Sequence, residues 1–103
     1  MKSPVDFEGR SLRLTEERRR HILSHPEMKE MITAISETLK TPEKVIQSLS
    51  DSEARLYYRF YPKTPVGAKY LCVIAKIPRD DAFILTAYLT DSVKKGEVLW
   101  PEK

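Results

Sequence analysis

The sequence predicts an α+β fold in which two N-terminal helices pack on one face of an antiparallel sheet of about four strands. Up to about residue 46, apolar residues recur at the three- and four-residue spacing of amphipathic helices. Beyond that point they alternate with other residues, as in strands. Each connection between the expected strands is short enough for an antiparallel meander, so the strands follow the helices as a second layer.

Length and composition limit the classes of protein to which the chain can belong. We expect 103 residues with 41% hydrophobic content to form one domain: an arm (1–14), helices (15–47), a sheet (48–90) and a C-terminal tail (91–103). The single cysteine, Cys72, excludes a disulfide within the chain. No apolar run approaches the roughly 20 residues that span a bilayer, and no secretion signal begins the sequence. We therefore expect a cytoplasmic protein with no membrane partner, and export through a specialised machine stays open as an alternative.

The N-terminal arm is expected to contain a short strand at residues 11–14 and to lead into a helix at about 15–24. Thr15 is suited to cap this helix because its hydroxyl can accept a hydrogen bond from the first turn, where two acids also favour the helix dipole. His25 precedes Pro26, and proline disfavours helical backbone in the residue before it. One helix is therefore expected to stop, and another to start, at this dipeptide.

The second expected helix, at about residues 26–39, is the main packing helix. A single apolar stripe runs along it, formed by Met28, Met31, Ile32, Ile35 and Leu39. The segment at residues 41–43 repeats the combination of cap and proline, which predicts one more helical turn carrying Val45 and Ile46.

The register of the last two strands follows from burial. Strands are expected at residues 46–50, 55–61, 69–77 and 83–90, and residues 98–100 form an apolar tail that can lie on the sheet. The odd-numbered residues of the third and fourth strands are apolar, so they must share the buried face, with Ile77 near Phe83. The opposite face then holds an even-numbered set: Cys72, Ile74, Lys76, Ile84, Thr86 and Tyr88.

The second strand has two alternating sets of residues. Leu56, Tyr58 and Phe60 form the more apolar set, which we expect to face the helices. Arg59 then points to the opposite face and joins Lys76 there.

Positive charge is concentrated in residues 54–79. These 26 residues contain six cations, no acid and four of the five tyrosines, whereas the flanking segments carry slightly more acids than cations. Uncompensated cations beside aromatic rings can neutralise a nucleic-acid backbone and stack its bases. The segment therefore predicts a phosphate-binding surface and RNA as a partner.

Four segments resemble the phage-type branch of the barnase, EndoU, colicin and RelE-like nuclease superfamily. They are residues 25–28 (His-Pro-Glu-Met), 56–59 (Leu-Tyr-Tyr-Arg), 69–76 and 83–89, and the likeness extends over about residues 16–96. The resemblance implies a helical layer on an antiparallel sheet whose open face cleaves RNA without a metal or other cofactor. In that reaction the ribose 2′-OH attacks the adjacent phosphate.

Such a reaction needs a proton acceptor, a proton donor and cations for the phosphoryl oxygens. The catalytic candidates are His25, Arg59, Lys76, Thr86 and Tyr88. Arg59 and Lys76 would clamp the phosphate, and His25, with an unperturbed pKa of roughly 6.5, would transfer protons. Thr86 and Tyr88 would hydrogen-bond the phosphate or deliver a proton, and Tyr88 can do so as an acid only if cations lower its pKa.

Four further residues complete the expected RNA contacts: Tyr57, Tyr61 and Lys69 beside the phosphate clamp, and Glu27, which would orient His25 or act alone as the base. Each candidate also has a structural alternative. Arg59 also fits an arginine on a solvated strand face, and Lys76 fits an edge-strand lysine that prevents aggregation. His25 also fits a helix cap. His21 and His25 stand at a spacing that suits a metal, but no third ligand accompanies them, so no metal site is expected.

Three functions therefore remain open. The first is a small endoribonuclease, as in the toxin module of a toxin-antitoxin or phage-related locus. The second is a non-catalytic RNA-binding protein on the same fold. The third is a protein-interaction module whose tyrosines and Trp100 meet an acidic partner such as an antitoxin or immunity protein.

Overall fold

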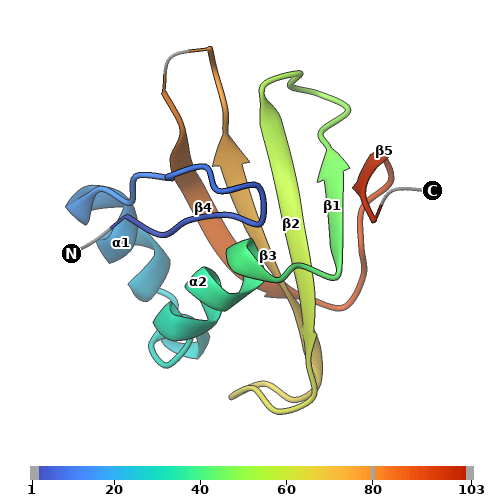
Figure 1. Ribbon diagram of the computed structural model, residues 1–103. Helices are drawn as coiled ribbons and strands as arrows, with labels where there is room; N and C mark the ends of the chain where they lie inside the picture. The colour runs from blue at the N-terminus through green and yellow to red at the C-terminus, as the bar shows by residue number, and fades with distance from the viewer. Residues whose placement is uncertain (1–2, 80, 102–103) are drawn as a thin grey trace.

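Two helices cover one face of a five-stranded antiparallel sheet in the computed structural model, which describes residues 3–79 and 81–101 (Figure 1). The elements in chain order are α1 (Glu16–Leu23), the short 3-10 helix η1 (Pro26–Met28), α2 (Ile32–Lys40), β1 (Lys44–Gln47), β2 (Ala54–Tyr61), β3 (Lys69–Lys76), β4 (Phe83–Thr90) and β5 (Glu97–Trp100). The strand order is β4-β3-β2-β1-β5. The predicted fold class is confirmed, with a fifth strand because the C-terminal tail pairs with β1.

The start of α1 confirms the predicted cap. The Thr15 hydroxyl accepts a hydrogen bond from the backbone N–H of Arg18 at 3.2 Å. His25 has the extended backbone expected of a residue before proline (φ −84°, ψ 118°), and Pro26 opens η1. In the arm, single bridges at Ser11 and Arg13 replace the expected strand.

The continuous helix predicted over residues 26–39 is wrong, because η1 and α2 are separate. The backbone N–H of Met28 bonds to the carbonyl of His25 at 2.9 Å, and the N–H of Met31 bonds to the carbonyl of Met28 at 3.0 Å. These tighter turns still bury both methionines beside Ile35 and Leu39 of α2. The apolar stripe therefore reaches the core without one unbroken helix.

The helical turn predicted at Val45 and Ile46 is also wrong, because both residues belong to β1. Val45 packs in the core between sheet and helices, whereas Ile46 packs on the opposite face of the sheet. A strand places consecutive side chains on opposite faces, so burial of both residues requires extended backbone.

The predicted pairing of β3 with β4 is confirmed from Tyr70 to Ile74 of β3. Leu71 pairs with Leu89 and Val73 with Ala87. A β-bulge then shifts the register, so that Ala75 pairs with Ile84 and Leu85 is the extra residue. The prediction that Ile84 lies on the face opposite the helices is therefore wrong, because Ile84 is buried on the helix face. Phe83 was expected near Ile77 but pairs with Lys76.

The face of the sheet that the helices leave uncovered is called the open face below. Most of its side chains come from even-numbered positions of β1, β2, β3 and β4: Ile46, Leu56, Tyr58, Phe60, Tyr70, Cys72, Ile74, Lys76, Thr86 and Tyr88. The link from β4 to β5, residues 91–96, covers part of this face. Val93 packs on the open-face core, and the backbone N–H of Lys94 donates to the Tyr58 hydroxyl at 3.1 Å.

Candidate nucleic-acid interface

The prediction that β2 turns Arg59 toward the open face is wrong. Tyr57 pairs with Val73 and Arg59 with Leu71, and both partners belong to the core beneath the helices. The even-numbered set, with Leu56 and Tyr58, packs on the open face instead. Both sets are apolar enough to be buried, since a tyrosine ring is apolar once its hydroxyl has a hydrogen-bond partner.

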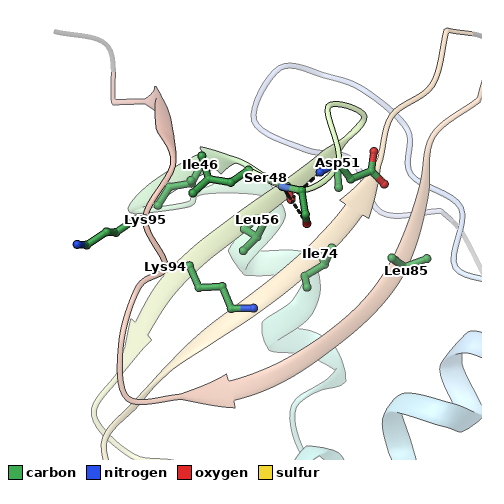
Figure 2. A pocket seen from close by; sticks show the side chains of 11 residues that line it. Ile46, Ser48, Asp51, Leu56, Ile74, Leu85, Lys94 and Lys95 are labelled. Atoms are coloured by element: carbon green, nitrogen blue, oxygen red, sulfur yellow. Dashed lines mark hydrogen bonds between the residues drawn. The ribbon is translucent and has the colours of Figure 1, made fainter.

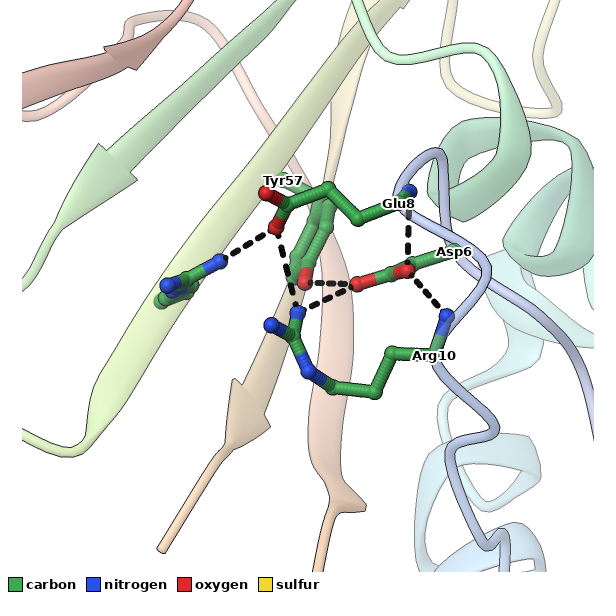
Figure 3. A network of polar contacts seen from close by, with 5 residues as sticks. Asp6, Glu8, Arg10 and Tyr57 are labelled. Atoms are coloured by element: carbon green, nitrogen blue, oxygen red, sulfur yellow. Dashed lines mark hydrogen bonds and ion pairs between the residues drawn. The ribbon is translucent and has the colours of Figure 1, made fainter. Parts of the chain in front are cut away.

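Tyr57 is not available to stack a base, because its ring is buried under the N-terminal arm. Its hydroxyl donates to the buried Asp6 carboxylate at 2.8 Å, as Figure 3 shows. Arg10 donates to the same carboxylate oxygen at 2.8 Å, and Glu8 links Arg10 to Arg55. Burial and the Asp6 carboxylate raise the pKa of Tyr57 well above its usual value. Tyr57 therefore fastens the arm to the sheet.

Arg59 and Tyr61 are occupied by the end of α2. The Arg59 guanidinium donates to the carbonyl of Thr41 at 2.7 Å, and its Nε lies 3.7 Å from Glu37 Oε1. The Tyr61 hydroxyl donates to the same Glu37 oxygen at 2.6 Å. Burial and this carboxylate raise the pKa of Tyr61 to about 12. The expected roles of Arg59 as a phosphate clamp and of Tyr61 as a stacking ring are therefore replaced by structural contacts on the helix face.

His25 lies at the junction of α1 and η1, with 58% of its side chain exposed. Its Nδ1 is 3.7 Å from Glu27 Oε1, and its ring meets that of His21 edge-on at 6.0 Å. His25 occupies the N-cap position but makes no side-chain cap bond. Within residues 3–79 and 81–101, no hydrogen bond or ion pair joins His25 to a strand residue, and no group of three or more His, Cys, Asp or Glu side chains could hold a metal.

Lys76, Thr86 and Tyr88 share the open face. Thr86 pairs with Ile74 and Tyr88 with Cys72, which confirms that these even-numbered residues share one face. Lys69 instead lies at the far end of β3, where it pairs with Asp91. Three of the five catalytic candidates thus share one face of the sheet. Their convergence on one phosphate and their catalytic roles stay predictions.

An acid that was not predicted from the sequence, Asp51, lies beside Lys76. Asp51 Oδ2 is 3.0 Å from the ammonium of Lys76, and Asp51 Oδ1 accepts a hydrogen bond from the backbone N–H of Glu53 at 2.9 Å. These two contacts, the backbone bond first, lower the pKa of Asp51 below its usual value. The open face therefore carries an ionised carboxylate next to a cation.

The phenol of Tyr88 is held in its neutral form. Burial, together with the neighbouring Cys72, raises the pKa of Tyr88, and burial raises the pKa of Tyr58 to about 12. Burial also raises the pKa of the Cys72 thiol. The condition set for Tyr88 as an acid, a pKa lowered by cations, is not met, so at neutral pH its hydroxyl acts as a hydrogen-bond donor.

A cleft of about 490 Å³ opens on this face between the loop at residues 48–51 and the link at residues 91–96 (Figure 2). Lys94 extends over the strands toward Ile74, and Lys95 points outward from the link. Gly96 lets the link approach β1, because a Cβ there would lie 2.5 Å from the carbonyl oxygen of Gln47. Lys94 and Lys95, the two consecutive lysines before this glycine, are the sequence feature that could have indicated a cationic side to the cleft.

The comparisons with known proteins leave the chain's family open. No protein-family model, curated protein or solved structure matches it. None of the helices in the described ranges is both long and apolar enough to span a membrane.

Proposed function

We propose that this protein is a metal-independent endoribonuclease that binds RNA on the open face of its sheet. The proposal includes membership of the RelE-like nuclease superfamily that its motifs resemble, and a toxin-type role with a neutralising protein partner. The observation that carries it is that Asp51 pairs with Lys76 and lines the same cleft as Lys94, on the face that also holds Thr86 and Tyr88. Cations, hydroxyls and a proton acceptor are the groups that RNA transesterification requires.

The proposed reaction uses this chain's residues as follows. The Asp51 carboxylate takes the proton of the ribose 2′-OH as the 2′-oxygen attacks phosphorus. The bond from phosphorus to the 5′-oxygen breaks, leaving a 2′,3′-cyclic phosphate, and the departing oxygen takes a proton from Lys94. Lys76 and the neutral hydroxyl of Thr86 stabilise the negative charge on the phosphoryl oxygens, and the neutral hydroxyl of Tyr88, further along the same face, donates a hydrogen bond to the flanking part of the RNA strand.

This assignment moves the site away from the helix junction. Arg59 and Tyr61 bond to α2, and Tyr57 bonds to the arm, so none of them is needed for RNA. His25 keeps an exposed position with Glu27 at the end of α1. In this proposal His25 and Glu27 take no part in proton transfer.

Cleavage of single-stranded RNA in EDTA tests the proposal. We expect 2′,3′-cyclic phosphate and 5′-hydroxyl ends, and a rate reduced by about 10²- to 10⁴-fold in Asp51→Asn, the range typical of a lost acid–base group. Lys76→Ala should also lose activity, whereas Lys40→Ala, which removes an exposed lysine from α2, should not. Equal activity of Asp51→Asn and wild-type protein, both with native circular dichroism, would overturn the assignment.

A non-catalytic RNA-binding protein is the second candidate. It is favoured by the high pKa values of Tyr58 and Tyr88 and by the position of His25 away from the open face. On this view RNA binds the same lysines without being cut. Retardation of RNA by wild-type protein and its loss in Lys76→Ala, with no cleavage in EDTA or Mg²⁺, would support this candidate over the enzyme.

A further inference from the structure

The cleft on the open face has an apolar floor contributed by four adjacent strands. Ile46 of β1, Leu56 of β2, Ile74 of β3 and Leu85 of β4 line it (Figure 2). Its volume of about 490 Å³ lies within the range of roughly 300–1,000 Å³ usual for small-molecule sites. The floor is therefore suited to a flat, largely apolar group rather than to a phosphate.

The bulge in β4 helps to build this floor. Ile84 pairs with Ala75 and is buried toward the helices, yet the next residue, Leu85, lines the cleft. In an unbulged strand that kept the pairing of Val73 with Ala87, Leu85 would face the helices with the other odd-numbered residues. The extra residue thus turns an apolar side chain toward the open face.

Hydrogen bonds hold the backbone of both walls of the cleft. On one side the Ser48 hydroxyl accepts hydrogen bonds from the backbone N–H groups of Ser50 and Asp51, both at 3.3 Å. On the other side the link is held by the bond from Lys94 to the Tyr58 hydroxyl. Among the described residues, the side chains of Lys94 and Lys95 have no ion-pair partner. The mouth of the cleft thus carries positive charge from the link.

We propose that this cleft is a subsite for one unstacked nucleobase of an RNA strand, with Lys94 holding a phosphate that flanks it. The inference rests on the proposed function. Bases splayed out of single strands bind on apolar and aromatic surfaces while cations hold the adjoining backbone. Asp51 lines the cleft and pairs with Lys76, so a base seated there brings its own phosphodiester to the proposed reacting groups. The subsite thereby determines which bond lies beside Asp51.

Binding of nucleoside 3′-monophosphates tests the subsite without any cleavage step. Titration followed by amide chemical shifts should perturb residues that line the cleft, and ribose 5-phosphate, which has no base, should bind about ten-fold more weakly. Leu85→Trp, which fills the cleft, should weaken nucleotide binding about ten-fold. Val66→Trp, an equally large change in the exposed β2–β3 loop, should leave it unchanged.

A second variant guards against misfolding of Leu85→Trp. Leu49 lies on the wall with 79% of its surface exposed, so Leu49→Ala should fold normally and still weaken nucleotide binding. Equal affinity for nucleotides and ribose 5-phosphate, or full affinity in both cleft variants, would overturn the subsite. Nucleotide binding without RNA cleavage would keep the subsite and reject the enzyme. If both cleft variants cleave RNA at the wild-type rate and with the same base preference, the enzyme is kept and the subsite is rejected.

Discussion

Arg59 and Lys76 lie on opposite faces of the sheet. The guanidinium of Arg59 donates to the Thr41 carbonyl at 2.7 Å on the helix side, while the ammonium of Lys76 lies 3.0 Å from Asp51 on the open side. A single phosphate therefore cannot contact both. Of the two expected clamps, Lys76 alone remains a candidate for RNA binding, and the sheet separates it from the end of α2.

Arg59 should contribute to stability, and Lys76 should contribute to RNA binding. Arg59→Gln removes the bond to the end of α2, so it should lower the free energy of unfolding by about 1 kcal/mol, measured by urea denaturation. It should leave RNA affinity almost unchanged at fixed ionic strength. Lys76→Gln is the matched control on the other face and should weaken RNA binding. A loss of affinity in Arg59→Gln as large as that in Lys76→Gln would contradict the separation.

Tyr57→Phe should destabilise the protein without altering RNA binding. The change removes the hydroxyl that donates to the buried Asp6 carboxylate, so a buried acceptor loses one partner. Such a loss reduces the free energy of unfolding by about 1–3 kcal/mol. Tyr70→Phe is the control, since no hydrogen bond of the Tyr70 hydroxyl is present among the described residues. Equal stability of the two variants would show that the arm is not held by this contact.

The Asp51–Lys76 contact should make the free energy of unfolding fall at acidic pH. Because the pKa of Asp51 is lowered from 3.8 in the folded protein, its carboxylate contributes stability above about pH 3.8. That contribution is lost as the pH falls through the lower, folded-state value. Asp51→Asn should therefore show a shallower decline in unfolding free energy below about pH 4, measured by urea denaturation at a series of pH values. A decline as steep as that of the wild type would argue against the contact.

The salt dependence of RNA affinity should show whether Lys94 of the link contacts a phosphate. Each phosphate neutralised on a single strand contributes about 0.7 to the slope of log affinity against log salt concentration. Lys94→Ala should reduce the slope by roughly that amount, measured by fluorescence anisotropy with a labelled oligonucleotide. Lys40→Ala, which removes an exposed lysine from α2 on the other side of the sheet, should leave the slope unchanged. If both variants keep the wild-type slope, the link does not contact RNA.

Patterns between near neighbours in the sequence predicted much of the fold. The cap at Thr15, the break at His25 and the bounds of β2, β3 and β4 agree with the structure to within one residue. The pairing of Leu71 with Leu89 was also predictable, because one row of each strand is clearly more apolar than the other. The shared face of Lys76, Thr86 and Tyr88 follows from that pairing.

Periodicity could not settle which side of β2 meets the helices. Both of its rows are apolar enough to be buried, so the choice depends on the packing of two layers at once and on partners for the tyrosine hydroxyls, such as Asp6 and Glu37. The bulge at Leu85, the pairing of Asp51 with Lys76 and the crossing of Lys94 over the open face likewise join segments far apart in the chain. The sequence alone therefore established the two layers and the strands β2, β3 and β4. The composition of the open face was set by long-range packing, because burial and charge pairing are optimised over the whole fold rather than within a single strand.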